Sequence, residues 1–279
     1  MEIYFMPVLH AKMMPGKKAK RPNNKDGRFE KALSLARKGD AAGAIVDFTK
    51  WLKSNPESVE AWVNLGLCNA DIGEFKGEAN AYVKALAVAP ERADIWINLG
   101  QCYDRMGKYD DAVRAYRKSI ALEPDDAVAW FDLGVALKAL GDIPTSNEAY
   151  RKALSLNPGD AGAWLNFGIV LFEQNDYSGA IEATKKALAL DPDDGQGWYN
   201  LGLIAHRNGD RAEELRSYRK AVEVDPSLAP AWYNLGVSLE LEGMFRKAVN
   251  AYRKALEIDP DDRDARKALK GLENRLSRG

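Results

Sequence analysis

The stretch VEAWVNLGLCNADIGEFKGEANAYVKALAVAPER, residues 59–92, decides the fold. Within it Trp62, Leu65 and Gly66 stand at i, i+3 and i+4, which is the spacing of one face of a helix. A Gly-Glu pair interrupts this pattern, a second helical pattern follows, and Pro90 prevents that helix from continuing. The stretch therefore predicts a hairpin of two helices.

The same pattern returns every 34 residues along most of the chain. Seven of the twelve prolines keep this interval, at Pro56, Pro90, Pro124, Pro158, Pro192, Pro226 and Pro260. Six of the seven tryptophans also keep it, at Trp62, Trp96, Trp130, Trp164, Trp198 and Trp232. A fixed period of this length indicates an array of structural repeats. Because no hairpin can bury its apolar face alone, the copies must stack.

The pattern resembles that of the tetratricopeptide repeat family. That family has Trp, Leu-Gly and Tyr in the first helix, then Ala, an aromatic residue and Ala in the second helix, and a closing Pro. One copy here reads Trp96, Leu99, Gly100, Tyr103, Ala112, Tyr116, Ser119 and Pro124, and another reads Trp232, Leu235, Gly236, Leu239, Ala248, Tyr252, Ala255 and Pro260. The resemblance implies an all-α fold, a right-handed α-solenoid superhelix of helix-turn-helix hairpins.

Three regions follow from this resemblance. Residues 1–24 are a basic segment that we expect to be disordered, residues 25–262 hold seven repeats, and residues 263–279 form a solvating, capping helix. The repeats span 25–58, 59–92, 93–126, 127–160, 161–194, 195–228 and 229–262. The first copy is degenerate, with Arg28 where the others have Trp, as expected of an end repeat that has no upstream neighbour. In the capping helix Ala265, Leu269, Leu272 and Leu276 are predicted to form one apolar face.

Recurring small and aromatic residues predict how the helices pack. The glycine after each Leu, or after Phe167 in one copy, costs about 1 kcal/mol of helix propensity against Ala. Close packing at the glycine must therefore stabilise the fold by more than this amount. We expect the two helices of a hairpin to cross at Gly66, Gly100, Gly134, Gly168, Gly202 and Gly236. The second-helix aromatics are expected to fill the wedge between hairpins, at Tyr82, Tyr116, Tyr150, Tyr218 and Tyr252. Pro144 is expected in the first turn of a second helix, where its missing amide hydrogen is harmless.

Membrane and secretory segments are not predicted. No run approaches the roughly 20 apolar residues that a membrane helix needs. The apolar start of the chain precedes its basic residues and lacks a clear cleavage site, so we predict no secretory signal. Cys68 and Cys102 lie 34 residues apart, in equivalent positions of neighbouring repeats, and are expected to be buried free thiols. These features favour a cytoplasmic protein.

The formal net charge of the chain is -1, but the charge is unevenly distributed. The two ends are basic and the repeats are acidic. Because no aromatic residues are interleaved with the terminal lysines, we do not predict nucleic-acid binding.

Catalytic and metal sites are also not predicted. The chain has two histidines, His10 and His206, and no CxxC pair, so no metal or cofactor site is indicated. No paired carboxylates, nucleophile relay or phosphate-binding loop is evident, and we predict that the protein is not an enzyme.

Packing within a hairpin leaves a second apolar side on the first helices unexplained. The position five after Trp reads Leu67, Gln101, Val135, Ile169, Leu203 and Val237, and the position one after Trp includes Phe131, Tyr199 and Tyr233. Part of this side can pack on the next repeat. The rest is expected to be exposed in the concave groove formed by the first helices, and an apolar strip in a groove marks an interaction surface.

A polar row accompanies that strip, two positions after each Trp. It reads Asn64, Asn98, Asp132, Asn166, Asn200 and Asn234. No cap or turn requires Asn in the middle of a helix. A side-chain amide carries donors and an acceptor that match a peptide unit, so such a row can bind an extended chain without reading its sequence.

This row is similar to the asparagine ladder in the repeats of O-linked N-acetylglucosamine transferase, which holds the backbone of bound polypeptides. Asp132 departs from the ladder because an ionised carboxylate cannot donate a hydrogen bond. The alternative is that the row is solvated or inherited through duplication. A clamp for chaperone C-terminal tails would need Lys one after Trp, where this chain has apolar residues, so that partner is not expected.

We therefore predict a protein-protein interaction scaffold or adaptor that binds a polypeptide segment in its groove. The alternative is a self-assembling scaffold and homo-oligomer, in which the segment MEIYFMPVL and its basic flank occupy the chain's own acidic repeats or those of a neighbour.

Overall fold

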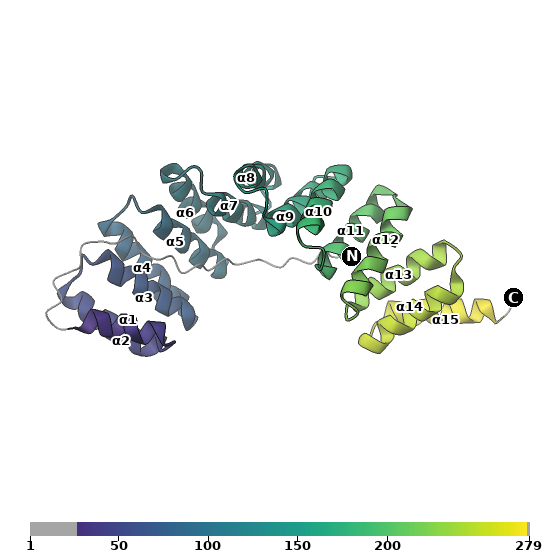
Figure 1. Cartoon of the computed structure of the whole chain (residues 1–279), viewed down its shortest axis with the longest axis horizontal. Coiled ribbons are helices and arrows are strands. Elements are labelled where there is room, and N and C mark those ends of the chain that lie inside the picture. Colours follow the sequence, from purple (N-terminus) through teal and green to yellow (C-terminus); the bar gives the residue numbers. More distant parts are fainter. Residues whose placement is uncertain (1–26, 278–279) are drawn as a thin grey trace. The chain divides into compact units, whose positions relative to one another are not determined.

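The computed structural model describes residues 27–277, and within that range it contains fifteen helices and no strand (Figure 1). The helices fall into two compact units, whose described parts are residues 27–156 and 157–277. The predicted tail, residues 1–24, lies outside the described residues.

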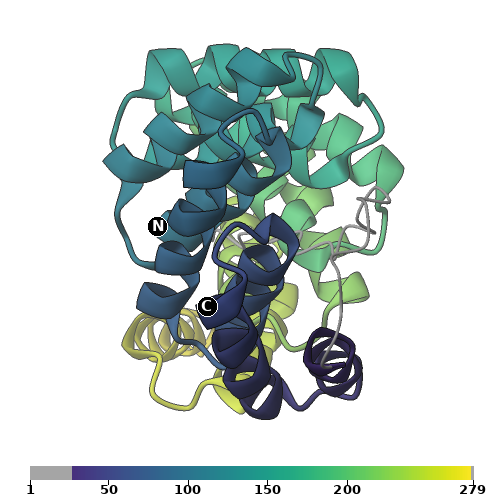
Figure 2. The ribbon, with the colours of Figure 1, turned by 90° about the vertical axis from the view of Figure 1, so that its left-hand side faces the viewer.

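Successive helices pair as hairpins in each unit (Figure 2). The first unit contains α1 (Arg28–Arg37), α2 (Ala41–Ser54), α3 (Val59–Asp71), α4 (Phe75–Val88), α5 (Ala93–Arg105), α6 (Tyr109–Leu122), α7 (Ala127–Ala139) and α8 (Ile143–Leu156). The second contains α9 (Ala161–Glu173), α10 (Tyr177–Leu190), α11 (Gly195–Asn208), α12 (Arg211–Val224), α13 (Ala229–Leu241), α14 (Phe245–Ile258) and α15 (Arg263–Leu276). The predicted all-α repeat solenoid is confirmed. Pro144 is the second residue of α8, in the first turn as expected.

The turn inside each hairpin depends on one residue with left-handed backbone. Gly107, for example, has φ 68°, and the equivalent residue of most other hairpins is also a glycine with positive φ. The exception is Asn175, with φ 64°, which is the one non-glycine residue of residues 27–277 in this conformation. Asn tolerates the left-handed region better than other residues with a side chain, so the turn keeps its geometry there.

The two helices of a hairpin cross where a glycine of the first helix meets the ring of the second-helix aromatic. A Cβ atom added to Gly100 would lie 2.5 Å from Cε1 of Tyr116, and one added to Gly202 would lie 2.4 Å from Cε1 of Tyr218. The tyrosine rings are almost fully buried. Beyond the crossing, Tyr116 also packs into one cluster with Leu133 of the next hairpin. Glycine is therefore required here by close approach of a ring, and the same ring joins two hairpins.

The recurring tryptophans and prolines are joined by a hydrogen bond. In every copy that has the Trp, its indole Nε1 donates to the carbonyl oxygen of the Pro six residues earlier, at 2.7 to 2.9 Å. This bond fixes the loop before each first helix against that helix. In α15, Arg266 occupies the Trp position and its guanidinium donates to the carbonyl of Pro260 instead.

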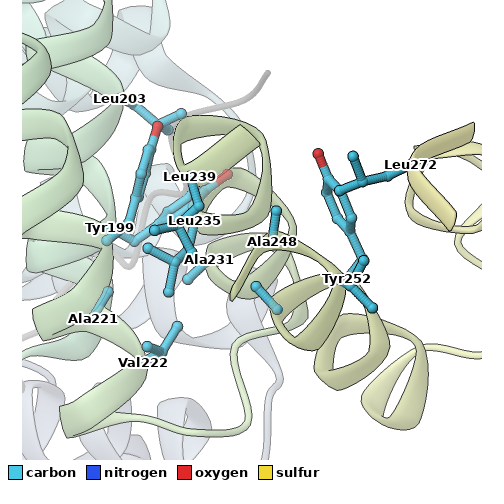
Figure 3. Packing of buried hydrophobic residues seen from close by; sticks show 13 residues of the cluster. Tyr199, Leu203, Ala221, Val222, Ala231, Leu235, Leu239, Ala248, Tyr252 and Leu272 are labelled. Carbon is cyan, nitrogen blue, oxygen red and sulfur yellow. The ribbon is translucent and has the colours of Figure 1, made fainter. Parts of the chain in front are cut away.

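Each unit ends on a modified hairpin or helix. In the first hairpin Phe29 packs against Phe48 and Trp51, with both pairs of ring centroids 5.8 Å apart. At the other end Leu272 of α15 packs beside Tyr252 (Figure 3). Ala265 and Leu272 are buried and Leu269 is partly buried, but Leu276 is 43% exposed, so the predicted apolar face is one residue too long. Leu276 is the last residue of the helix.

The predicted buried free cysteines are confirmed. Cys68 and Cys102 are both buried and unpaired. Burial raises the pKa of Cys68 to about 11 and that of Cys102 to about 12. Thiols held in their protonated form in this way are poor nucleophiles and poor metal ligands.

We predict that Gly100→Ala destabilises the protein although Ala favours a helix. The new methyl group overlaps the Tyr116 ring, and overpacking of this kind costs roughly 1–3 kcal/mol. The control is Gly271→Ala in α15, where nothing lies within 4 Å of an added Cβ. In Gly271→Ala the free energy of unfolding should increase by roughly 0.5–1 kcal/mol, because Ala lowers the conformational entropy of the unfolded chain. Urea unfolding followed by circular dichroism measures both changes, and equal gains in the two variants would refute the crossing.

Candidate functional site

The first helices of the hairpins carry the predicted polar row. In residues 27–277, α1 touches α3 and α5 touches α7, and Asn234 of α13 bonds to Tyr199 of α11, so first helices of these successive hairpins approach each other. We call the surface that they form the helix-A face. In the first unit it comes from α3, α5 and α7, and in the second from α9, α11 and α13.

In the first unit the three members of the row are partly exposed. Asn64 donates from Nδ2 to the carbonyl of Glu60, one turn earlier, at 2.8 Å. The side chain of Asn98 forms no hydrogen bond within residues 27–277. Asp132 accepts a bond of 2.8 Å from Nε2 of Gln101 on the preceding first helix. All three present polar atoms on the helix-A face.

In the second unit the three members of the row are buried. Asn166 donates to the carbonyl of Gly162 at 2.9 Å, and Asn234 donates to the hydroxyl of Tyr199 at 3.3 Å. Asn200 accepts from Gln196 at 3.2 Å, but its own Nδ2 has no hydrogen-bond partner in the described part of the chain. A buried donor without a partner costs about 1–3 kcal/mol. The two units therefore offer different versions of the same row.

The bonds to the preceding turn correct one sequence argument. Mid-helix Asn had no evident local purpose, yet Asn64 and Asn166 both donate to a backbone carbonyl of their own helix. Hydrogen bonds from a side chain to its own helix are a recognised pattern for polar residues. An amide that donates once in this way keeps a second N–H and its oxygen.

The predicted apolar strip is only partly accessible. Five residues after each Trp, Leu67, Val135 and Val237 are partly exposed, whereas Gln101, Ile169 and Leu203 are buried. One residue after Trp, Phe131 and Tyr199 are buried, and Tyr233 is partly exposed.

The aromatic residues that follow Trp pack on the tyrosine of their own hairpin. The ring centroid of Phe131 lies 5.8 Å from that of Tyr150, and the centroid of Tyr199 lies 6.0 Å from that of Tyr218. Such pairs add about 0.5–1.5 kcal/mol beyond the area that they bury. The sequence argument missed this packing, although an aromatic residue in both positions of one repeat was an available signal.

Asp132 is the titratable residue of the polar row, and its pKa is shifted. Burial raises its pKa to about 7, and the hydrogen bond from Gln101 opposes that rise. Nearby, burial raises the pKa of Asp104 to about 6, against the bond of 2.6 Å that Tyr116 donates to it. Near neutral pH a substantial fraction of Asp132 is therefore protonated, and a protonated carboxyl can donate a hydrogen bond as Asn does.

A polar chain in the second unit, in which Glu214 and Ser238 are buried and His206 is exposed, was also missed from the sequence. Oε1 of Glu214 lies 2.6 Å from the hydroxyl of Ser238, and Oε2 lies 3.3 Å from Nδ1 of His206. A nucleophile relay needs the imidazole between the hydroxyl and the carboxylate. Here the carboxylate is in the middle, so the three groups satisfy each other's hydrogen bonds and join α11, α12 and α13.

Two features that would indicate other functions are absent from the described residues. Among residues 27–277 no three His, Cys, Asp or Glu side chains gather closely enough to hold a metal ion. Within the same range no helix has the length and apolar character needed to cross a membrane.

Three solved structures are similar to this chain. YrrB, described as a TPR protein with an unusual peptide-binding site, is 25% identical with a TM-score of 0.61, over 69% of this chain and 99% of YrrB. MamA is 26% identical with a TM-score of 0.56, over 58% of this chain and 95% of MamA. The C-terminal part of a TPR repeat-containing protein from Cytophaga hutchinsonii has a TM-score of 0.74 at 17% identity, over 86% and 99% of the two chains, and supports the fold alone.

No match was found among curated proteins. Family models described as tetratricopeptide repeat match residues 93–126 and 229–262, residues 29–87, 131–194 and 165–229, and residues 115–146. Together these matches span most of the described helices. The chain therefore belongs to the tetratricopeptide repeat family.

Proposed function

We propose that this protein is a non-catalytic scaffold that binds an extended segment of a partner polypeptide along the helix-A face. The observation that carries the proposal is the group of partly exposed polar side chains at Asn64, Asn98 and Asp132, which lies beside Leu67 and Val135 on the same first helices. The peptide-binding site named for YrrB supports the same function.

The chemistry of these side chains suits a peptide backbone. Asn64 uses one N–H within its own helix and keeps one donor and its acceptor oxygen, while Asn98 keeps all of its groups. An extended ligand offers an N–H and a C=O at every residue, so each amide can form bonds that do not depend on the ligand's sequence. The neighbouring apolar side chains then supply selectivity.

The spacing of the helices sets how long a ligand must be to contact several members of the polar row. Packed helices lie about 8–10 Å apart, and an extended chain advances roughly 3.3 Å per residue. One member of the row is therefore met about every three residues, and a segment of roughly eight residues can reach three of them. Self-assembly through residues 1–24 stays a prediction, because that segment lies outside the described residues.

The first test removes the two exposed amides. A random dodecapeptide phage library selected on the full chain supplies peptide ligands, whose affinities are then measured by calorimetry. In the double variant Asn64→Ala, Asn98→Ala each lost hydrogen bond should cost about 0.5–1.5 kcal/mol, which weakens peptide binding by roughly 5- to 150-fold overall.

The matched control carries Asn80→Ala and Asn250→Ala, which remove two exposed amides from the second helices α4 and α14. These changes should leave the affinity unchanged. If every selected peptide binds the Asn64→Ala, Asn98→Ala variant as tightly as the original protein, while that variant keeps its helical circular dichroism, the helix-A face is not the site.

The second test concerns the proton of Asp132. Because its pKa is raised in the folded protein, the folded state binds a proton that the unfolded state lacks between about pH 4 and pH 7. The stabilisation that comes with this proton is fully present below the unfolded pKa and is lost as the pH rises through about 7. The free energy of unfolding should therefore fall across this window. Asp132→Asn should flatten the fall and leave the part due to Asp104 and Glu78, whose pKa values are also raised by burial.

Urea unfolding at several pH values between about 4 and 8 measures this effect. The control is Asp110→Asn, at an exposed position of α6. A pH dependence that is as steep in Asp132→Asn as in the original protein would contradict the raised pKa. For peptides that contact this residue, affinity should also decrease above about pH 7, because an ionised Asp132 no longer donates.

A further inference from the structure

A hollow of about 890 Å³ lies in the first unit between α4, α5 and α6. Trp96 and Tyr103 of α5 form part of its lining, Val83 and Leu86 contribute from α4, and α6 contributes a basic edge. We call it the Trp96 pocket. Its volume is within the range of roughly 300–1,000 Å³ that is usual for ligand sites.

The pocket lies where one repeat departs from the pattern of most of the others. The position after the second-helix aromatic slot is a long basic residue in five copies, at Arg117, Arg151, Lys185, Arg219 and Arg253, but it is Val83 in α4 and Thr49 in the end repeat. Long basic side chains cover apolar surface with their aliphatic stems. Val83 is too short to do so and is itself 46% exposed. The hollow beside Trp198, three periods later, measures about 450 Å³.

The edge of the pocket carries uncompensated positive charge. Arg114 is paired with Asp111. Arg117 and Lys118 are exposed, and the side chain of neither forms an ion pair or hydrogen bond with any residue from 27 to 277. An apolar floor beside two unpaired cations complements a segment in which apolar side chains stand next to carboxylates. A basic segment is disfavoured, and residues 1–24 of this chain carry five Lys or Arg against one acid.

We propose that the Trp96 pocket is a second docking site, which binds an apolar side chain of an acidic segment from a partner protein. Carboxylates of that segment pair with Arg117 and Lys118, while the apolar side chain fills the hollow that Val83 leaves uncovered. The pocket is lined by α6, α4 and α5, and its α5 residues are Trp96, Leu99 and Tyr103. None of these belongs to the polar row or the apolar strip that the peptide proposed above contacts. One unit can therefore hold two different chains at once, which is what a scaffold requires.

The experiment uses the full chain and a fluorescein-labelled nonapeptide in which Phe and Leu are separated by pairs of Glu or Asp. A second peptide has Lys at every acidic position. Fluorescence anisotropy should show binding of the acidic peptide and at least about tenfold weaker binding of the basic one. Val83→Arg, which installs the residue type of the equivalent positions, should weaken binding of the acidic peptide by about tenfold or more, because the Arg stem fills the pocket.

Val46→Arg is the matched control, because Val46 is a 49% exposed valine on α2, away from the pocket. It should leave the affinity unchanged, and so should Asn64→Ala with Asn98→Ala, so that failure here is distinguishable from failure of the helix-A proposal. The double variant Arg117→Glu, Lys118→Glu supplies a second test if Val83→Arg disturbs folding. No binding to the original protein, equal binding of both peptides, or unchanged affinity in the folded pocket variants would overturn the proposal.

Discussion

Close contact between a first-helix glycine and a second-helix tyrosine ring is the constraint on which the rest of the structure depends. At Gly100 and Tyr116 the ring lies where a Cβ atom would be, so the ring packs directly on the backbone of the first helix. The same ring is buried against the following hairpin. A single side chain therefore sets both the angle within a hairpin and the contact between hairpins.

This arrangement leaves one side of each first helix free of the crossing. Some residues of that side are still used for packing, as Phe131 is on Tyr150. What remains differs between the two units. In residues 27–156 the polar row is partly exposed, whereas in residues 157–277 it is buried and bonded to its surroundings. The first unit is therefore where the proposed peptide binding is concentrated, and its one acidic member, Asp132, makes that binding dependent on pH.

The fold could be predicted because spacing is visible in a sequence. The 34-residue period indicated the hairpins, and the small residues at Cys68 and Cys102 indicated buried positions. The bond from the Trp indole to the Pro carbonyl could not be predicted, because its acceptor is a backbone atom without a side-chain signature. The shared period of the two residues was its only trace. The exposure of Leu276 was missed because periodicity gives the face of a helix on which a residue lies but not the neighbours that cover it.

The site could be predicted less fully, because exposure depends on neighbours that the sequence does not place. The Asn row was evident, but its partners were not. Two of its members donate to their own helix, and burial separates the row into two groups. The Trp96 pocket had a sequence signal, since Val83 stands where the five following repeats have a basic residue, but only the packing of α4, α5 and α6 shows that a hollow lies there.

Site-specific photo-crosslinking tests the central claim most directly, namely that the helix-A face holds an extended polypeptide. A photoreactive phenylalanine analogue replaces the partly exposed Leu67 on that face or, as a control, Leu190 of α10, which is 48% exposed. After irradiation in a cell extract, mass spectrometry identifies the attached segments. The account predicts that Leu67 yields discrete segments of partner chains and Leu190 yields none of them. Equal or no crosslinking at the two positions would contradict it.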